Sequence, residues 1–136
     1  MIVNLTGKIL AVTTGKGRTH DFKLFKQSKH AKQIKDMKIL ADSGYQGISK
    51  ICPNATTPHK RKKKTPLTKE QKQANHTLSS KRIIAEQINA KIKVFKIVKY
   101  PYRNRRKRFG LRMNLICAII NLDLQTVDAS LSECLV

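Results

Sequence analysis

The pattern of apolar and polar residues divides the chain into short elements. Two β-branched runs, residues 2–6 and 9–14, lie on either side of Gly7 and predict an antiparallel hairpin. Apolar residues at helical spacing over residues 21–36 predict a helix, and the short apolar run 37–42 predicts a strand. The first third of the chain is therefore expected to form two strands, a helix and a further strand.

Helical patterns dominate the rest of the chain. Residues 68–93 predict a long helix, and Thr68 with Gln71 supplies the sequence of a capping box at its start. The β-rich residues 94–98 predict a short strand. Residues 113–124 predict a last helix with one buried face.

This order of elements is typical of an α/β domain. We assign residues 1–124 to one domain and residues 125–136 to a C-terminal tail. The longest apolar run, residues 115–122, is much shorter than the roughly 20 residues that a membrane-spanning helix needs. The N-terminus lacks the pattern of a secretion signal, and the three cysteines lie too far apart for a disulfide framework or a zinc motif. A reducing cytoplasm is the expected location.

The net charge narrows the class of partner. The chain has 29 Lys and Arg residues and 8 Asp and Glu residues, so its formal net charge is +21. Repulsion among so many positive charges favours binding to a polyanion. Nucleic acid is the first candidate. An acidic membrane surface is the second, but no basic amphipathic helix with large aromatic residues supports it. Aromatic residues make up only 5%, so a surface that stacks single-stranded bases is not favoured.

Much of the positive charge lies in two clusters, one beside Pro58 and the other before the last helix. We expect both to contact DNA phosphates rather than base edges, and a solvated charged surface is the alternative. The residues concerned are Lys60, Arg61, Lys62, Lys63, Lys64, Arg103, Arg105, Arg106, Lys107 and Arg108.

Asp42 and Glu86 differ from the other six acids in their context, and Asp21 is ambiguous. Asp21 follows His20 at the start of a helix, where it or Thr19 is expected to act as the cap. Asp42 instead ends an apolar strand, and ligands of α/β sheets gather at the carboxyl ends of strands. Spacing alone leaves Asp42 equally compatible with a turn-forming role and with metal binding.

Glu86 lies in the middle of the long helix. At about 100° per residue, Arg82, Glu86, Asn89 and Lys93 fall within about 60° of one another, whereas the isoleucines at 84, 88 and 92 lie on the other side. A solvated helix face with an Arg82–Glu86 pair is the alternative to a functional role.

Together, Asp42 and Glu86 suggest metal chemistry. Two-metal phosphoryl transfer needs carboxylates that hold two ions about 3.5–4 Å apart, with basic residues that bind phosphates nearby. Two carboxylates are too few for such a site, and a third from an adjacent strand is normally required.

Three segments resemble the DDE transposases of bacterial insertion sequences. Leu40-Ala41-Asp42-Ser43-Gly44-Tyr45 is similar to their second-aspartate block, and Gly17-x-x-His20-Asp21 to the preceding block of the IS5-like group. Arg82, Glu86 and Lys93 have the spacing of the R(3)E(6)K part of their glutamate signature, although Ser79 stands where that signature often has tyrosine.

The resemblance implies a ribonuclease H-like mixed sheet with flanking helices and Mg²⁺- or Mn²⁺-dependent cleavage and joining of DNA at transposon ends. Asp42 would be the second acid and metal ligand, Glu86 the third, and Arg82 and Lys93 would face DNA. The family's first aspartate belongs to a strand before the hairpin, which this sequence lacks. We therefore expect an incomplete catalytic domain, inactive alone, that assembles with other copies or with an upstream transposase half.

A different class of function also fits the charge. A non-catalytic basic nucleic-acid-binding protein would share the steep salt dependence of DNA binding, with a slope of about −0.9 per neutralised phosphate. The acids distinguish the two hypotheses, because such a protein would tolerate Asp42→Asn and would bind DNA as tightly or more tightly after it.

Overall fold

The computed structural model describes residues 1–15, 17–61, 66–100, 108–124 and 133–135. These residues form a mixed α/β domain. The expected α/β class is therefore confirmed. The elements, in chain order, are β1 (Ile2–Asn4), β2 (Ile9–Ala11), α1 (Asp21–Gln27), α2 (His30–Gln33), β3 (Lys38–Leu40), the 3-10 turns η1 (Ser43–Tyr45) and η2 (Ile48–Lys50), β4 (Ala55–Thr56), α3 (Lys69–Val94), α4 (Lys96–Lys99), α5 (Phe109–Asp123) and β5 (Glu133–Leu135).

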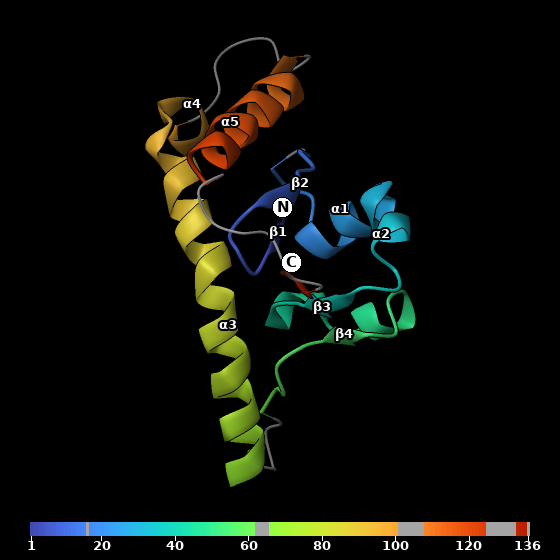
Figure 1. Ribbon diagram of the computed structural model, residues 1–136. Coiled ribbons are helices and arrows are strands. Elements are labelled where there is room, and N and C mark those ends of the chain that lie inside the picture. The colour runs from blue at the N-terminus through green and yellow to red at the C-terminus, as the bar shows by residue number, and fades with distance from the viewer. Residues whose placement is uncertain (16, 62–65, 101–107, 125–132, 136) are drawn as a thin grey trace.

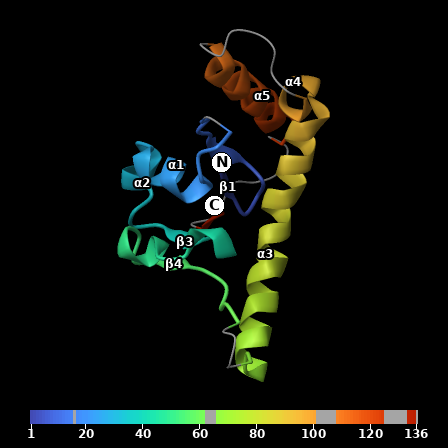
Figure 2. The same cartoon turned by 180° about the vertical axis from the view of Figure 1, so that it is seen from behind.

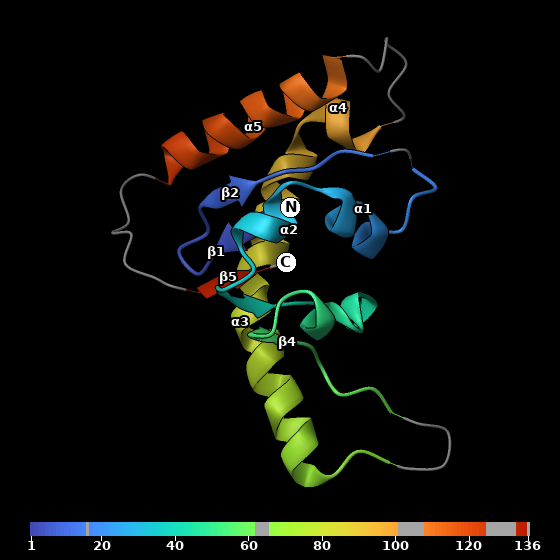
Figure 3. The ribbon, with the colours of Figure 1, turned by 90° about the vertical axis from the view of Figure 1, so that its right-hand side faces the viewer.

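The strands form one mixed sheet with the order β2-β1-β5-β3-β4. Strand β1 is antiparallel to both of its neighbours, β2 and β5. Strand β3 is parallel to both of its neighbours, β4 and β5. The sheet therefore changes from antiparallel to parallel at β5, which lies between β1 and β3 in Figure 3.

Helices cover the two faces of the sheet. Helix α3 runs along one side, and α1 and α2 lie on the opposite side (Figures 1 and 2). Alternate residues of a strand point to opposite faces. Val3 and Leu40 accordingly join the core beneath α3 and α5, whereas Ile2 and Ile39 join the core beneath α1 and α2.

The hairpin of β1 and β2 forms as expected. Gly7 has a φ of 88°, which glycine adopts without the steric cost that a Cβ would bring. The Asn4 side-chain oxygen accepts hydrogen bonds from the Thr6 and Lys8 amides and from the Thr6 hydroxyl. These bonds close the turn and set the register of the first two strands.

The expected helix over residues 21–36 is instead two short helices. The Ser28 amide and hydroxyl both donate to the carbonyl of Phe25, and these bonds end α1 at Gln27. Two residues separate α1 from α2. The cap is also different: the His20 ring nitrogen Nδ1 accepts from the Phe22 amide at 3.2 Å, so neither Thr19 nor Asp21 is the capping residue.

Helix α3 begins with the expected capping box, in which Thr68 and Gln71 each bond to the other's backbone amide. The strand expected over residues 94–98 is wrong, because α3 extends to Val94 and α4 follows at once. Ile97 and Val98 pack against the core beneath α3 and α5, and this tertiary contact outweighs their β-propensity.

Helix α5 begins at Phe109, one turn earlier than expected, and it packs its buried residues against the hairpin side of the sheet. Asn121 makes two hydrogen bonds to the backbone of Ile9, one through its oxygen and one through its amide nitrogen, each 2.8 Å long. Strand β2 lies at the edge of the sheet, so this side chain satisfies backbone groups that have no neighbouring strand. No helix among the described residues is long and apolar enough to cross a membrane.

Candidate functional site

Asp42 lies just past the end of β3, where the chain leaves the sheet. It is the N-cap of η1, and its side-chain oxygen Oδ1 accepts a hydrogen bond from the Ser43 amide. The Asp42 side chain is 51% exposed, so its remaining lone pairs are accessible from solvent. Both roles left open by the sequence, turn formation and ligand binding, are thus compatible with its position.

The polar face of α3 lies opposite Asp42. Arg82, Glu86 and Asn89, which succeed one another at intervals of one helical turn, line a cavity of about 270 Å³ that Asp42 also lines. Ile88 is buried on the other side of the helix, as the sequence predicts. The structure therefore brings together two acids that are distant in the sequence.

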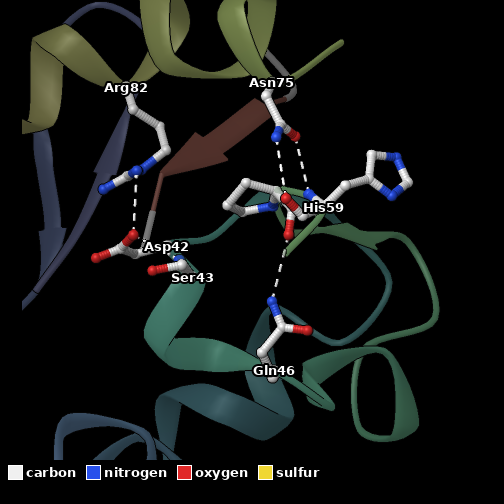
Figure 4. Close-up of polar contacts among 7 residues, drawn as sticks. Asp42, Ser43, Gln46, His59, Asn75 and Arg82 are labelled. Carbon is white, nitrogen blue, oxygen red and sulfur yellow. Dashed lines mark hydrogen bonds and ion pairs between the residues drawn. The ribbon is translucent and has the colours of Figure 1, made fainter. Parts of the chain in front are cut away.

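Arg82 contacts Asp42 across this cavity (Figure 4). Its guanidinium nitrogen Nη1 lies 3.4 Å from Asp42 Oδ1, and the Arg82 side chain is only 20% exposed. The expected alternative was an ion pair between Arg82 and Glu86 within one helix, whereas the ion pair observed joins α3 to the end of β3. Arg82 consequently places positive charge beside the acid that sits at the carboxyl end of the strand.

Asp21 and Tyr45 also line the cavity, and sequence reasoning assigned neither of them to the site. The Tyr45 ring packs edge-on against Phe22 and Phe25, with centroid distances of 5.7 and 6.0 Å. Burial raises the pKa of Tyr45, and the negative charges of Asp21 and Asp42 raise it further. Both residues belong to segments that resemble the DDE transposases: Asp21 to Gly17-x-x-His20-Asp21 and Tyr45 to the segment from Leu40 to Tyr45. That resemblance was the signal that could have identified them.

The donor set for a metal ion is incomplete. Among the residues that the structure describes, no group of three His, Cys, Asp or Glu side chains is close enough to hold an ion. Asp21, Asp42 and Glu86 line the cavity together with the cationic Arg82, but these three acids do not form a group close enough to hold an ion. Additional donors would be needed to complete a metal site.

The sequence matches a family model described as DDE superfamily endonuclease over residues 1–121. The chain belongs to this family. It is also 48% identical over 119 residues to the probable transposase for insertion sequence element IS702 from Microchaete diplosiphon. That match covers 88% of this chain and 43% of the relative, so the chain spans less than half of the relative's length. No solved structure matches the chain.

The basic residues of this DDE-family chain are only partly described. Lys60 and Arg61 are exposed. The two residues before them are held by hydrogen bonds (Figure 4): Asn75 on α3 exchanges two with the backbone of His59, and Gln46 donates one to the Pro58 carbonyl. Lys93 on α3 and Arg108 at the start of α5 are exposed as well. The other expected phosphate contacts, Lys62, Lys63, Lys64, Arg103, Arg105, Arg106 and Lys107, lie outside the described residues.

Proposed function

We propose that this chain is part of the catalytic domain of an IS5-like DDE transposase, acting on transposon ends and target DNA in the cytoplasm. The observation that supports it best is the shared cavity of Asp42 and Glu86, which come from the end of a strand and the middle of a helix. The family match over residues 1–121 supports the same class of activity.

Under this proposal the fold is ribonuclease H-like. The combination of an antiparallel hairpin, a parallel pair of strands and a long flanking helix supports this fold. The protein would act as an assembly, either of several copies or with an upstream transposase half, because the acids described in one copy do not form a group that could hold a metal ion.

Asp42 and Glu86 are the proposed catalytic acids and the ligands of Mg²⁺ or Mn²⁺. Carboxylate oxygens suit these hard cations, and the half-exposed Asp42 has accessible lone pairs. Since the described donors are incomplete, we expect the isolated chain to bind DNA without cleaving it.

The basic residues are proposed to hold the DNA backbone. Arg82 lies in the cavity, and Lys93, three helical turns further along α3, is about 16 Å away along the helix axis. Lys60 and Arg61 follow a loop that is fixed to α3, which would hold the first basic cluster near the same helix. Arg108 begins the helix that follows the second cluster.

Metal binding by the two acids can be tested without catalysis. Titration of the full chain with Mn²⁺, followed by electron paramagnetic resonance, should show a site that Asp42→Asn and Glu86→Gln each weaken. Glu70→Gln is the matched control, because Glu70 is an exposed acid in the first turn of the same helix. Equal Mn²⁺ affinity in all four proteins would reject Asp42 and Glu86 as ligands.

A non-catalytic basic nucleic-acid-binding protein is the second candidate function. The net charge of +21 is the observation that favours it. Both candidates predict that log Kd for DNA rises steeply with log salt concentration. Only the transposase hypothesis predicts that Mn²⁺ changes DNA affinity in the unmodified chain and has no effect after Asp42→Asn. Metal-dependent nicking by the pure chain, abolished by Asp42→Ala, would instead show that the chain is active alone.

A further inference from the structure

Helix α5 is apolar on two opposite sides. Its buried residues pack against the core that it shares with β2 and α3. The exposed side carries Leu111, Leu115, Ile119 and Leu122, which are between 41% and 69% exposed. A helix that is apolar all round is normally covered all round. Figure 3 shows α5 at the edge of the molecule, with no other described element on its outer side.

Four of the exposed residues form a straight stripe. Leu111, Leu115, Ala118 and Leu122 follow one another at intervals of four, three and four residues, which is the spacing of contact positions between two packed helices. At about 100° per residue they fall within about 60° of one another, on the side opposite the buried residues. We call these four residues the α5 stripe.

The α5 stripe differs from the rest of the surface in its charge. Among residues 111–122 only Arg112 is charged, and it is partly buried and lies beside the stripe rather than on it. An uncharged apolar surface gains nothing from DNA phosphates. In a chain with a net charge of +21, it is also a surface on which two copies can meet with little local repulsion.

The α5 stripe is complementary to itself. A two-fold axis through its middle sets α5 of two copies antiparallel, so that Leu115 of each copy faces Ala118 of the other and Leu111 faces Leu122. Ala118 lines a groove of about 200 Å³ between β2 and α5, which Leu10 also lines. In both copies a large projecting side chain therefore meets a small residue beside a groove.

The charges at the ends of α5 favour the same arrangement. Arg108 is the N-cap of the helix and Asp123 is its last residue, and both are exposed. An antiparallel pair brings the Arg108 end of each helix toward the Asp123 end of the other and also opposes the two helix dipoles. A parallel pair would instead bring like charges together at both ends.

We propose that the α5 stripe is a dimer interface, on which α5 of one copy packs antiparallel against α5 of a second copy. The interface is small, because each copy contributes few side chains, so the dimer should be weak and reversible. The proposed function calls for an assembly but gives it no surface. The inference rests instead on the exposed side of α5, and it holds whether or not the chain cleaves DNA.

Sedimentation equilibrium of the full chain, without DNA or metal, tests the interface. Over roughly 2 to 200 μM the unmodified chain should form a dimer that dissociates on dilution. Leu115→Lys should weaken the dimer at least about ten-fold, because it places a charge in the middle of the stripe. Val94→Lys is the matched control, since it adds the same charge at an exposed aliphatic residue of α3 and should leave the affinity unchanged.

The salt dependence separates this dimer from association through DNA. Salt screens the repulsion between two chains of +21 each, so the dimer should become tighter as salt rises, whereas DNA binding becomes weaker. A monomer at every concentration, or equal dimerisation of the unmodified chain and Leu115→Lys, would overturn the proposal. Flotation of a monomeric chain with phosphatidylcholine vesicles, lost in Leu115→Lys, would assign the stripe to a lipid surface instead.

Opposite charges at facing positions test the antiparallel register. Leu115→Glu and Ala118→Lys should each weaken self-association, because each buries two unpaired charges in the dimer. A mixture of the two variants should form a heterodimer, since the two introduced charges face each other only between unlike copies. Both positions are exposed, and circular dichroism of each variant should match that of the unmodified chain. A mixture that associates no more than the separate variants would reject the antiparallel pairing.

Discussion

Asn121 is the residue whose replacement should most clearly weaken the hairpin half of the sheet. It makes two 2.8 Å hydrogen bonds to the amide and carbonyl of Ile9, which is 6% exposed. Each such bond contributes about 1 kcal/mol net, so Asn121→Ala should lower the free energy of unfolding by about 2 kcal/mol. For a chain of this size, that loss corresponds to a decrease in Tm of about 8 °C, measured by circular dichroism.

The matched control replaces another asparagine of α5 with alanine. Asn114 lies on the same helix and is exposed, so Asn114→Ala should change Tm by no more than about 2 °C. Asn121→Asp keeps the oxygen that accepts from Ile9 but replaces the donor nitrogen with a second oxygen, so it should destabilise at least as much as alanine. Equal Tm values for the Asn121 and Asn114 variants would refute the assignment of Asn121 as the clamp of β2.

Three further predictions follow from local geometry and from one pKa. Gly7→Ala should cost about 1–2 kcal/mol in chemical denaturation, because φ is 88° and the added Cβ would lie 3.4 Å from Ile88, whereas Gly44→Ala meets nothing within 4 Å and should be nearly neutral. Thr68→Ala should cost about 1 kcal/mol and speed amide exchange in the first turn of α3, with Thr77→Ala as the exposed control on that helix. The pKa of Tyr45 is raised in the folded chain, first by burial, so the unfolded chain loses this proton first and stability should fall as pH rises above the ordinary value of 10.0. Tyr45→Phe should reduce that fall in urea titrations at several pH values, and an unchanged pH dependence would contradict the assignment.

Elements with a strong local signal were predicted correctly. The hairpin followed from β-branched runs around Gly7, and the start of α3 followed from Thr68 and Gln71, whose side chains bond to each other's amides. The alternation of polar and isoleucine positions on α3 also placed Arg82 and Glu86 on one face correctly. Each of these features depends on residues within a few positions of one another, which a sequence pattern can represent.

The errors arose where local preference and packing disagree. Residues 94–98 are β-rich, but Ile97 and Val98 lie against the core beneath α3 and α5 and the backbone stays helical. The expected single helix over 21–36 is divided by Ser28, whose side chain bonds to the Phe25 carbonyl and competes with the helical pattern. Neither outcome follows from the frequency of apolar residues alone.

The candidate site could be predicted as a list of residues but not as an arrangement. Asp42 and Glu86 were identified by their strand-end and helix-face contexts, whereas the contact between Arg82 and Asp42 joins residues 40 positions apart. The same limit applies to β5, because a three-residue strand has no periodicity and gains its hydrogen bonds from β1 and β3. The cavity is lined both by residues from the hairpin half, such as Ile2 and Ala11, and by Asp42 from the parallel half. Residues from both halves of the sheet therefore line one cavity, and the spacing of these residues along the sequence does not reveal that arrangement.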